Sequence, residues 1–264
     1  EAFAVGANGV AVRYDGFSWQ HDTALESLAH EKLVSVVGFS SPLELFVLGV
    51  DGQVFHFRDS WSAIPSGSMF PLVALTGVAR DNVIGVGINE VWRLNGTTWT
   101  QIPNPSGPAV NFHGVWAASA TDIYAVGEAD LAQGMSATDG IVRRYDGSSW
   151  STPHFIADTP LWGVGGASAS DVYVAGPLTG TTSTAHFNGA WVTLMDASTM
   201  GANGTAVWAS APDDTFIAGQ NGIFHFMGMW SKPSTAPMTA IHGSSRQNVI
   251  AVGPAGTIWR YAPR

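Results

Sequence analysis

The chain has 264 residues, of which 45% are hydrophobic and only 12% are charged, and its formal net charge is -9 at pH 7. Nucleic-acid binding depends on clustered Lys and Arg, which this chain lacks, so we do not expect a nucleic-acid partner. No run of about 18 apolar residues could span a bilayer. The chain has no cysteine, which rules out disulfides and thiolate chemistry.

A hydrophobic strand ends on a glycine seven times along the chain. These glycines are Gly6, Gly49, Gly87, Gly127, Gly176, Gly219 and Gly253. Their spacing is typical of repeats that each form one four-stranded propeller blade. We therefore predict an all-β fold, a seven-bladed β-propeller of four-stranded antiparallel blades. It would form a single domain over residues 1–264, with repeats at approximately 1–32, 33–70, 71–110, 111–159, 160–203, 204–237 and 238–264.

The strands of a complete repeat are called a, b, c and d in chain order. Residues 1–20 supply only b, c and d of the first repeat. The fourth repeat shows all four, with a over 112–117, b over 123–126, c over 141–145 and d over about 148–152. Its c and d strands are joined by Asp-Gly, as in the first repeat, while the third and fifth repeats have Asn-Gly; both dipeptides favour a type I′ turn.

The last repeat, residues 239–264, supplies only strands a, b and c. About two strands are missing from the first and last repeats together. Either the natural chain extends beyond these residues, or the propeller has two three-stranded blades.

Two polar positions recur in every repeat. Five residues before each glycine stands a possible hydrogen-bond acceptor: Glu1, Glu44, Asn82, Asp122, Asp171, Asp214 and Asn248. In strand c stands a nitrogen donor: Arg13, His56, Arg93, Arg144, His186, His225 and Arg260. We predict that acceptor and donor pair within each blade and brace the a-to-b turn. Catalysis would not need seven such pairs, so zinc binding or acid–base chemistry at these histidines is disfavoured.

Strand d carries a tryptophan in six repeats. These are Trp19, Trp61, Trp99, Trp150, Trp191 and Trp230. Because a residue present in nearly every repeat belongs first to the scaffold, we expect these indoles to pack between blades.

The consensus of the fourth repeat, VWAASATDIYAVG followed by IVRRYDGSSW, resembles the repeats of bacterial exported and cell-surface β-propellers. The D-G-x-x-W hairpin also resembles the Asp-box turn of sialidases, and residues 43–62 are similar to repeats of seven-bladed propeller lectins. The resemblance implies a propeller in a secreted, periplasmic or cell-surface bacterial protein. It implies no reaction, because the arginine triad and the tyrosine with a nearby glutamate that sialidases use do not stand out from the repeat background.

Long segments fall on one end of the blades, where the d-to-a links and b-to-c loops emerge. They are residues 21–32, 128–140, 177–184 and 192–204. Loops on a rigid scaffold often carry binding residues, so we expect the ligand at this end. Residues 128–140 occur in one blade only and contain Glu128, Asp130 and Asp139. They either bind calcium through oxygen ligands or form a plain solvated loop; we predict no other cofactor.

Strand a contributes His113 in the fourth repeat and Trp162 in the fifth, beside two of the long segments. An indole can stack on the apolar face of a sugar while an imidazole and carboxylates bind its hydroxyls. The predicted ligand-binding residues are therefore His113, Trp162, Glu128, Asp130 and Asp139, with no catalytic or metal residue. The alternative is that His113 and Trp162 only pack.

Three functions follow, in order of preference. The first is a non-enzymatic, lectin-like module that binds a glycan or another extracellular surface. The second is a protein-interaction or assembly scaffold, and the third a sialidase-like hydrolase or lyase, which needs a convergent carboxylate pair that the sequence does not show. An exposed apolar patch at residues 227–230 would favour the scaffold, whereas a polar pocket beside Trp162 would favour the lectin.

Overall fold

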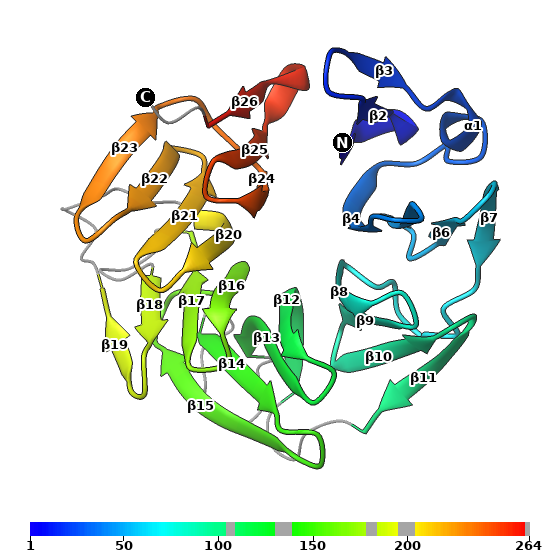
Figure 1. Cartoon of the computed structure of the whole chain (residues 1–264). Coiled ribbons are helices and arrows are strands. Elements are labelled where there is room, and N and C mark those ends of the chain that lie inside the picture. The colour runs from blue at the N-terminus through cyan, green and yellow to red at the C-terminus, as the bar shows by residue number, and fades with distance from the viewer. Residues whose placement is uncertain (104–108, 130–138, 178–183, 195–203, 262–264) are drawn as a thin grey trace. The chain divides into compact units, whose positions relative to one another are not determined.

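The structure, a computed structural model, describes residues 1–103, 109–129, 139–177, 184–194 and 204–261. It contains seven antiparallel sheets, each a simple meander. The predicted fold class, an all-β seven-bladed propeller, is confirmed. The chain divides into two compact units, residues 1–104 and 105–264; Figure 1 labels their strands. Among the described residues, every helix is too short and too polar to cross a membrane.

The first unit contains three blades, one turn of α-helix and a 3₁₀ turn, η1 (Ala7–Gly9). Its first blade is β1 (Ala2–Val5), β2 (Ala11–Tyr14) and β3 (Trp19–His21), followed by α1 (Thr23–Glu26). Its second blade is β4 (Leu33–Phe39), β5 (Glu44–Gly49), β6 (Val54–Phe57) and β7 (Trp61–Ile64). Its third is β8 (Ala74–Ala79), β9 (Asn82–Gly87), β10 (Glu90–Asn95) and β11 (Thr98–Ile102).

The second unit contains four blades. The fourth blade is β12 (Val110–Ser119), β13 (Asp122–Ala129), β14 (Gly140–Tyr145) and β15 (Trp150–Ile156). The fifth is β16 (Gly163–Ser168), β17 (Asp171–Ala175), β18 (Thr184–Phe187) and β19 (Trp191–Thr193). The sixth is β20 (Gly204–Ala211), β21 (Asp214–Gly219), β22 (Gly222–Phe226) and β23 (Trp230–Ser234), and the seventh is β24 (Ala240–Ser245), β25 (Asn248–Val252) and β26 (Ile258–Arg260). The first and last blades thus have three strands, as the sequence predicts.

The hydrophobic cores lie between neighbouring blades of the same unit. Strand b is the most deeply buried strand; every residue of β5 and of β21 is buried. Side chains from both faces of such a strand enter two different cores: Phe46 packs toward the third blade and Val47 toward the first. This alternation follows from the two-residue period of a strand that is buried on both faces.

The glycine that ends strand b makes room for the link that enters the same blade. A Cβ atom at Gly176 would lie 2.0 Å from the carbonyl oxygen of Pro160, and one at Gly253 would lie 2.3 Å from that of Pro237. At Gly6 nothing lies within 4 Å, because the first blade has no strand a and no entering link. The recurrent glycine therefore has a packing function at Gly176 and Gly253, whereas a Cβ atom at Gly49 would instead meet the Asp51 side chain, at 2.6 Å.

The predicted acceptor–donor pairs are confirmed in the five repeats that carry a carboxylate. The closest nitrogen–oxygen distances are 2.9 Å for Arg13–Glu1, 2.7 Å for His56–Glu44, 2.7 Å for Arg144–Asp122, 2.6 Å for His186–Asp171 and 2.6 Å for His225–Asp214. In each pair the base lies directly across from the residue two positions after the acid.

The residue two positions after the acid is aromatic in every repeat whose acceptor is a carboxylate. The imidazole of His225 stacks on Phe216 with centroids 3.7 Å apart, and the guanidinium of Arg144 lies 5.3 Å from the ring centre of Tyr124. In the two repeats with asparagine the equivalent residues are Ile84 and Ile250. The aromatic ring covers the base, so the pair is held between a turn and an apolar wall.

The same position also ties one blade to the next. Where it is tyrosine, its hydroxyl donates to a backbone carbonyl in the a-to-b turn of the following blade: Tyr124 to Ala169 at 2.9 Å and Tyr173 to Pro212 at 3.1 Å. Where it is Phe46 or Phe216, an arginine from the a-to-b turn of the following blade instead lies near the acid. Arg80 is 3.4 Å from Glu44, and Arg246 is 3.4 Å from Asp214.

The strand-d tryptophans pack against strand c of their own blade. Ring centroids lie 5.2 to 5.4 Å apart in five blades: Tyr14–Trp19, Phe57–Trp61, Tyr145–Trp150, Phe187–Trp191 and Phe226–Trp230. The expected scaffold role is confirmed, although the main aromatic partner is in the same blade. Two of these tryptophans also contact a ring of another blade: Trp61 lies 6.0 Å from Phe3, and Trp191 stacks on His154 with centroids 4.7 Å apart.

The type I′ prediction for the c-to-d turns is wrong. In the first and fourth blades only the glycines, Gly16 and Gly147, have positive φ, whereas a type I′ turn needs positive φ at both central residues. Instead the Asp15 carboxylate accepts backbone N–H bonds from Phe17 and Ser18, which lowers its pKa. The aspartate side chain thus supports the turn, which is also closed by a hydrogen bond from the Asp15 amide to the Ser18 carbonyl at 3.3 Å.

Candidate functional site

The d-to-a links and b-to-c loops lie at one end of the blades of each unit, which we call the link-and-loop end. In the second unit it carries His113 and Trp162, whose ring centroids lie 5.5 Å apart, and Glu128, whose Oε1 lies 3.6 Å from Nε2 of His113. The indole of Trp162 is 44% exposed, and the other two side chains are about one third exposed. Three of the five predicted site residues therefore form one cluster.

A β-bulge places His113 in this cluster. Phe112 pairs with Gly127 and Gly114 pairs with Val126, so His113 is the extra residue of β12. Bulges re-aim side chains at strand ends. Equivalent bulges place Val34 in β4 and Thr205 in β20, so the backbone feature recurs while the side chain differs.

Glycine brings Trp162 close to the fourth blade. A Cβ atom at Gly114 would lie 2.5 Å from the carbonyl oxygen of Trp162, so a larger residue there would force the two blades apart. The Trp162 amide donates to the carbonyl of Ala175 at 2.8 Å, which fixes its backbone against β17. The indole is thus held at the blade junction by backbone contacts.

Asp139 does not belong to this cluster. It is buried, and its carboxylate accepts the backbone N–H of Asp158 at 2.9 Å, which joins the residue before β14 to the link after β15. Asp130 lies outside the described residues. Within the described ranges no group of three or more His, Asp or Glu side chains could hold a metal ion. Calcium binding by residues 128–140 stays a prediction.

The cluster combines an exposed indole face with an imidazole and a carboxylate. The Nε2 atom of His113 is buried and has no hydrogen-bond partner among the described residues, although the Glu128 carboxylate is near. Such a group can bind a ligand with one apolar face and hydroxyl or amine groups.

The first unit carries a feature that the sequence did not reveal. Five apolar side chains at its link-and-loop end are between 38% and 81% exposed: Val50, Met69, Phe70, Val73 and Ile88. We call them the apolar strip. They come from the b-to-c loops of the second and third blades and from the link between these blades. Val50 and Ile88 both follow the repeat glycine, whereas Met69 and Phe70 lie in the link. Repeat periodicity gave no signal for Met69 and Phe70; the run S-M-F-P at the link was the one local hint.

Backbone contacts hold the segments of the apolar strip together. A Cβ atom at Gly52 would lie 2.8 Å from Cα of Pro71, and one at Gly87 would lie 2.9 Å from the Pro71 carbonyl oxygen. The link is fastened further where the hydroxyl of Ser68 bonds the Glu90 carboxylate, which also accepts from the indole of Trp92 at 3.0 Å. These contacts hold in place the backbone segments that carry the apolar strip.

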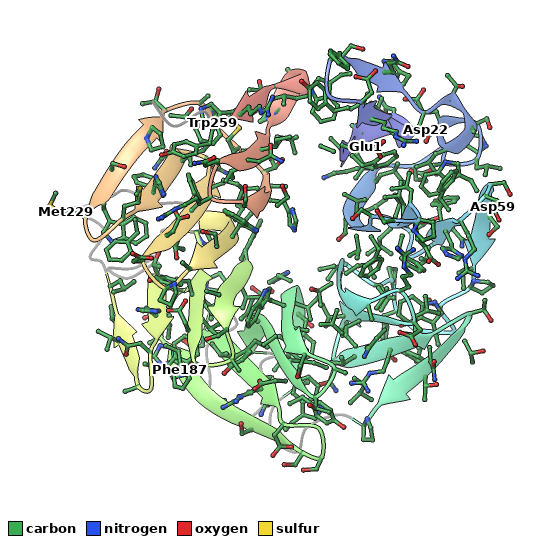
Figure 2. All side chains as sticks on the ribbon, in the orientation of Figure 1. Glu1, Asp22, Asp59, Phe187, Met229 and Trp259 are labelled. Carbon is green, nitrogen blue, oxygen red and sulfur yellow. The ribbon has the colours of Figure 1, made fainter. Side chains whose placement is uncertain are left out.

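Apolar side chains are also exposed at two c-to-d turns. Met229 is 81% exposed and Met227 54% in the sixth blade, and Phe17 is 96% exposed in the first; Figure 2 shows Met229 at the edge of its blade. We predicted that an exposed apolar patch at residues 227–230 would favour an interaction scaffold. That patch is present.

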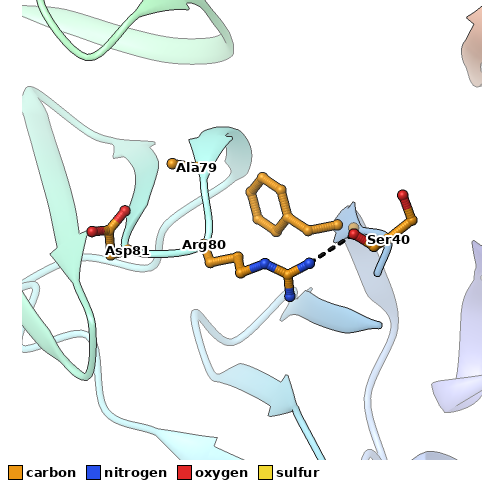
Figure 3. A pocket seen from close by; sticks show the side chains of 6 residues that line it. Ser40, Ala79, Arg80 and Asp81 are labelled. Carbon is orange, nitrogen blue, oxygen red and sulfur yellow. Dashed lines mark hydrogen bonds between the residues drawn. The ribbon is translucent and has the colours of Figure 1, made fainter. Parts of the chain in front are cut away.

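Two pockets lie in the first unit. One, of about 690 Å³, is open and lies at the a-to-b turns around Arg80, Phe39 and Ser40. Figure 3 shows the Arg80 guanidinium bound to the Ser40 carbonyl, at 2.7 Å. Because Arg80 also reaches Glu44, its charge is already engaged. The other pocket, of about 520 Å³, lies between residues 28–33 and the second blade.

Known proteins support the fold alone. No family model and no curated protein sequence matches the chain. Among solved structures, YCF48 from Cyanidioschyzon merolae is 15% identical with a TM-score of 0.71, covering 99% of this chain and 91% of its own; YCF48 has also been solved bound to D1 peptide. The WD40 propeller domain of Doa1 is 8% identical with a TM-score of 0.72 (99% and 88% covered), and a gluconolactonase from Xanthomonas campestris is 12% identical with 0.65 (88% and 86% covered).

Proposed function

We propose that this protein is a non-catalytic recognition module that binds a peptide segment of a partner protein through the link-and-loop end of its blades. The apolar strip carries the proposal. Single exposed apolar residues are ordinary, but five exposed apolar side chains on three segments whose backbones are in close contact are typical of protein interaction sites.

The chemistry of the partner follows from charge. Residues 1–104 contain ten acidic and five basic residues, and the whole chain carries -9. A partner segment with apolar side chains and a net positive charge would complement this surface, and the opposite charges would speed encounter. The propeller neighbours are consistent with this class of function, since YCF48 has been solved with a peptide.

Photocrosslinking tests the proposal. A benzoylphenylalanine residue would replace Met69 in the apolar strip or, as the control, Thr97, which is exposed at the c-to-d turn of the third blade. In cells of the source organism we expect discrete crosslinked adducts at position 69 and none at position 97. Equal crosslinking at both positions, or none at either, would contradict the proposal.

Glycan binding is the second candidate, favoured by the exposed Trp162 beside His113 and Glu128. It would fit a secreted, periplasmic or cell-surface location. A glycan array run with and without calcium tests it: selective binding that is lost in Trp162→Ala supports this candidate, and a blank array removes it.

A further inference from the structure

The pocket beside α1 has the composition of a receptor for a basic side chain. It has a volume of about 520 Å³, within the range of about 300–1,000 Å³ usual for ligand sites. Its apolar lining includes Leu28, Phe55 and Trp61, and its ionisable lining is His30, Glu31 and Asp51. An apolar wall with carboxylates beside it suits an aliphatic stem that ends in a cation.

The indole in this wall is fixed in place. The Nε1–H of Trp61 donates to both carboxylate oxygens of Asp22, at 3.1 and 3.2 Å. Asp22 is itself held as the N-cap of α1, where it accepts the backbone N–H of Leu25 at 3.0 Å. Figure 2 shows Asp22 beside α1. A ring fixed in this way can receive a cation without losing side-chain entropy on binding.

The two carboxylates of the pocket have no cation of their own. Glu31 and Asp51 are exposed, and among the described residues neither makes an ion pair with a Lys, Arg or His side chain. One oxygen of Asp51 accepts the backbone N–H of Gln53 at 3.0 Å, which orients the group. By contrast Glu26 and Glu44, elsewhere in this unit, are paired with histidine or arginine.

The pocket is continuous with the apolar strip. Asp51 and Gly49 line the pocket, while Val50 between them is part of the strip. The amide of Val50 donates to the carbonyl of Lys32 at 2.8 Å, which joins the b-to-c loop to the segment that forms the other side of the pocket. One extended peptide can therefore contact both features.

We infer that the pocket binds an arginine or lysine side chain of the partner segment, with its stem along Leu28 and Trp61 and its cation near Glu31 and Asp51. The inference rests on the proposed function and specifies its partner: a segment with a basic residue next to apolar residues. The acidic balance of this unit gives the matching long-range attraction.

A peptide selection tests this inference. A phage-displayed library of random dodecapeptides is selected on the purified chain in low salt, and the enriched peptides are synthesised with a fluorescent label for anisotropy. We expect the enriched sequences to share an Arg or Lys within three positions of Leu, Met, Phe or Trp. The double variant Glu31→Gln/Asp51→Asn should weaken binding at least about tenfold, and added salt should weaken binding to the unmodified chain.

Two further variants keep the outcomes apart. Asp59→Asn removes an exposed carboxylate at a c-to-d turn of the same unit and should leave the affinity within about twofold. Met69→Ser/Phe70→Ser changes the strip but not the pocket. If binding depends on the strip but not on Glu31 and Asp51, or if the enriched peptides lack basic residues, the pocket inference fails and the proposed function stands. If no peptide is enriched, or none depends on either site, both fail.

Discussion

The Nε2 atom of His225 lies 2.6 Å from a carboxylate oxygen of Asp214, and both side chains are at least 95% buried. The Asp214 carboxylate also accepts a hydrogen bond from the hydroxyl of Ser210, and it lies 3.4 Å from Arg246 of the next blade. One acidic side chain thus joins its own strand c, its own turn and the neighbouring blade. The same pair recurs with decreasing burial in other blades, which allows a graded test.

Removing the acid should cost stability in proportion to its burial. The exposed fraction of the acid side chain is 1% for Asp214, 17% for Asp122 and 55% for Glu1. We expect alanine to cost about 3–5 kcal/mol at Asp214, about 1–3 kcal/mol at Asp122, and less than about 1 kcal/mol at Glu1. Urea unfolding gives the three values. Equal losses at all three, or loss of peptide binding in a stable Asp122→Ala variant, would argue against a purely structural pair.

The recurrent glycine should be replaceable in one repeat and not in another. Gly176→Ala places a methyl group against the Pro160 carbonyl and should destabilise the protein by about 1–3 kcal/mol or more. Gly6→Ala, at an extended φ of -161° with open space around it, should change stability by less than about 0.5 kcal/mol. Thermal unfolding of the two variants measures the difference, and a tolerated Gly176→Ala would refute the packing function.

Tyr124 should remain protonated at pH 10, the ordinary pKa of a tyrosine phenol. Burial raises the pKa of its phenol to about 12, so the neutral form is favoured in the folded protein. The resulting stabilisation is complete below pH 10 and is lost as the pH rises through about 12. Absorbance at 295 nm should show a late-ionising tyrosine that is missing from Tyr124→Phe. If the phenol ionises near pH 10, this prediction is wrong.

The Glu44 carboxylate should contribute stability at neutral pH that is lost in acid. Burial tends to raise its pKa, but the hydrogen bond from His56 and the charges of Arg58 and His56 outweigh it, so the pKa lies below the ordinary value of 4.5. The contribution is therefore complete above about pH 4.5 and disappears as the pH falls through the lower, folded value. We expect Glu44→Gln to be less stable than the unmodified protein at pH 7, with a smaller difference at pH 3. Urea midpoints at the two pH values decide it; a constant difference would contradict the assignment.

The sequence by itself determined the features that repeat. Seven glycines, the acceptor and donor positions and the strand-d tryptophans set the number of blades, the strand order and the pairing of Asp122 with Arg144. This was possible because a repeated local pattern must be satisfied locally in every copy, so the period reveals its role. The adjacency of His113 and Trp162 also followed from their equivalent places in consecutive repeats.

Only the tertiary structure decided the features that occur once. The Asp139 carboxylate accepts a backbone N–H from Asp158. The exposure of Met69 and Phe70 depends on how the link between two blades runs. The hydrogen bond that fixes the Trp61 indole comes from Asp22, the N-cap of α1. None of these has a repeat to reveal it. Their roles come from contacts between segments with no common pattern, and burial and hydrogen bonding of such segments are fixed only when the blades pack.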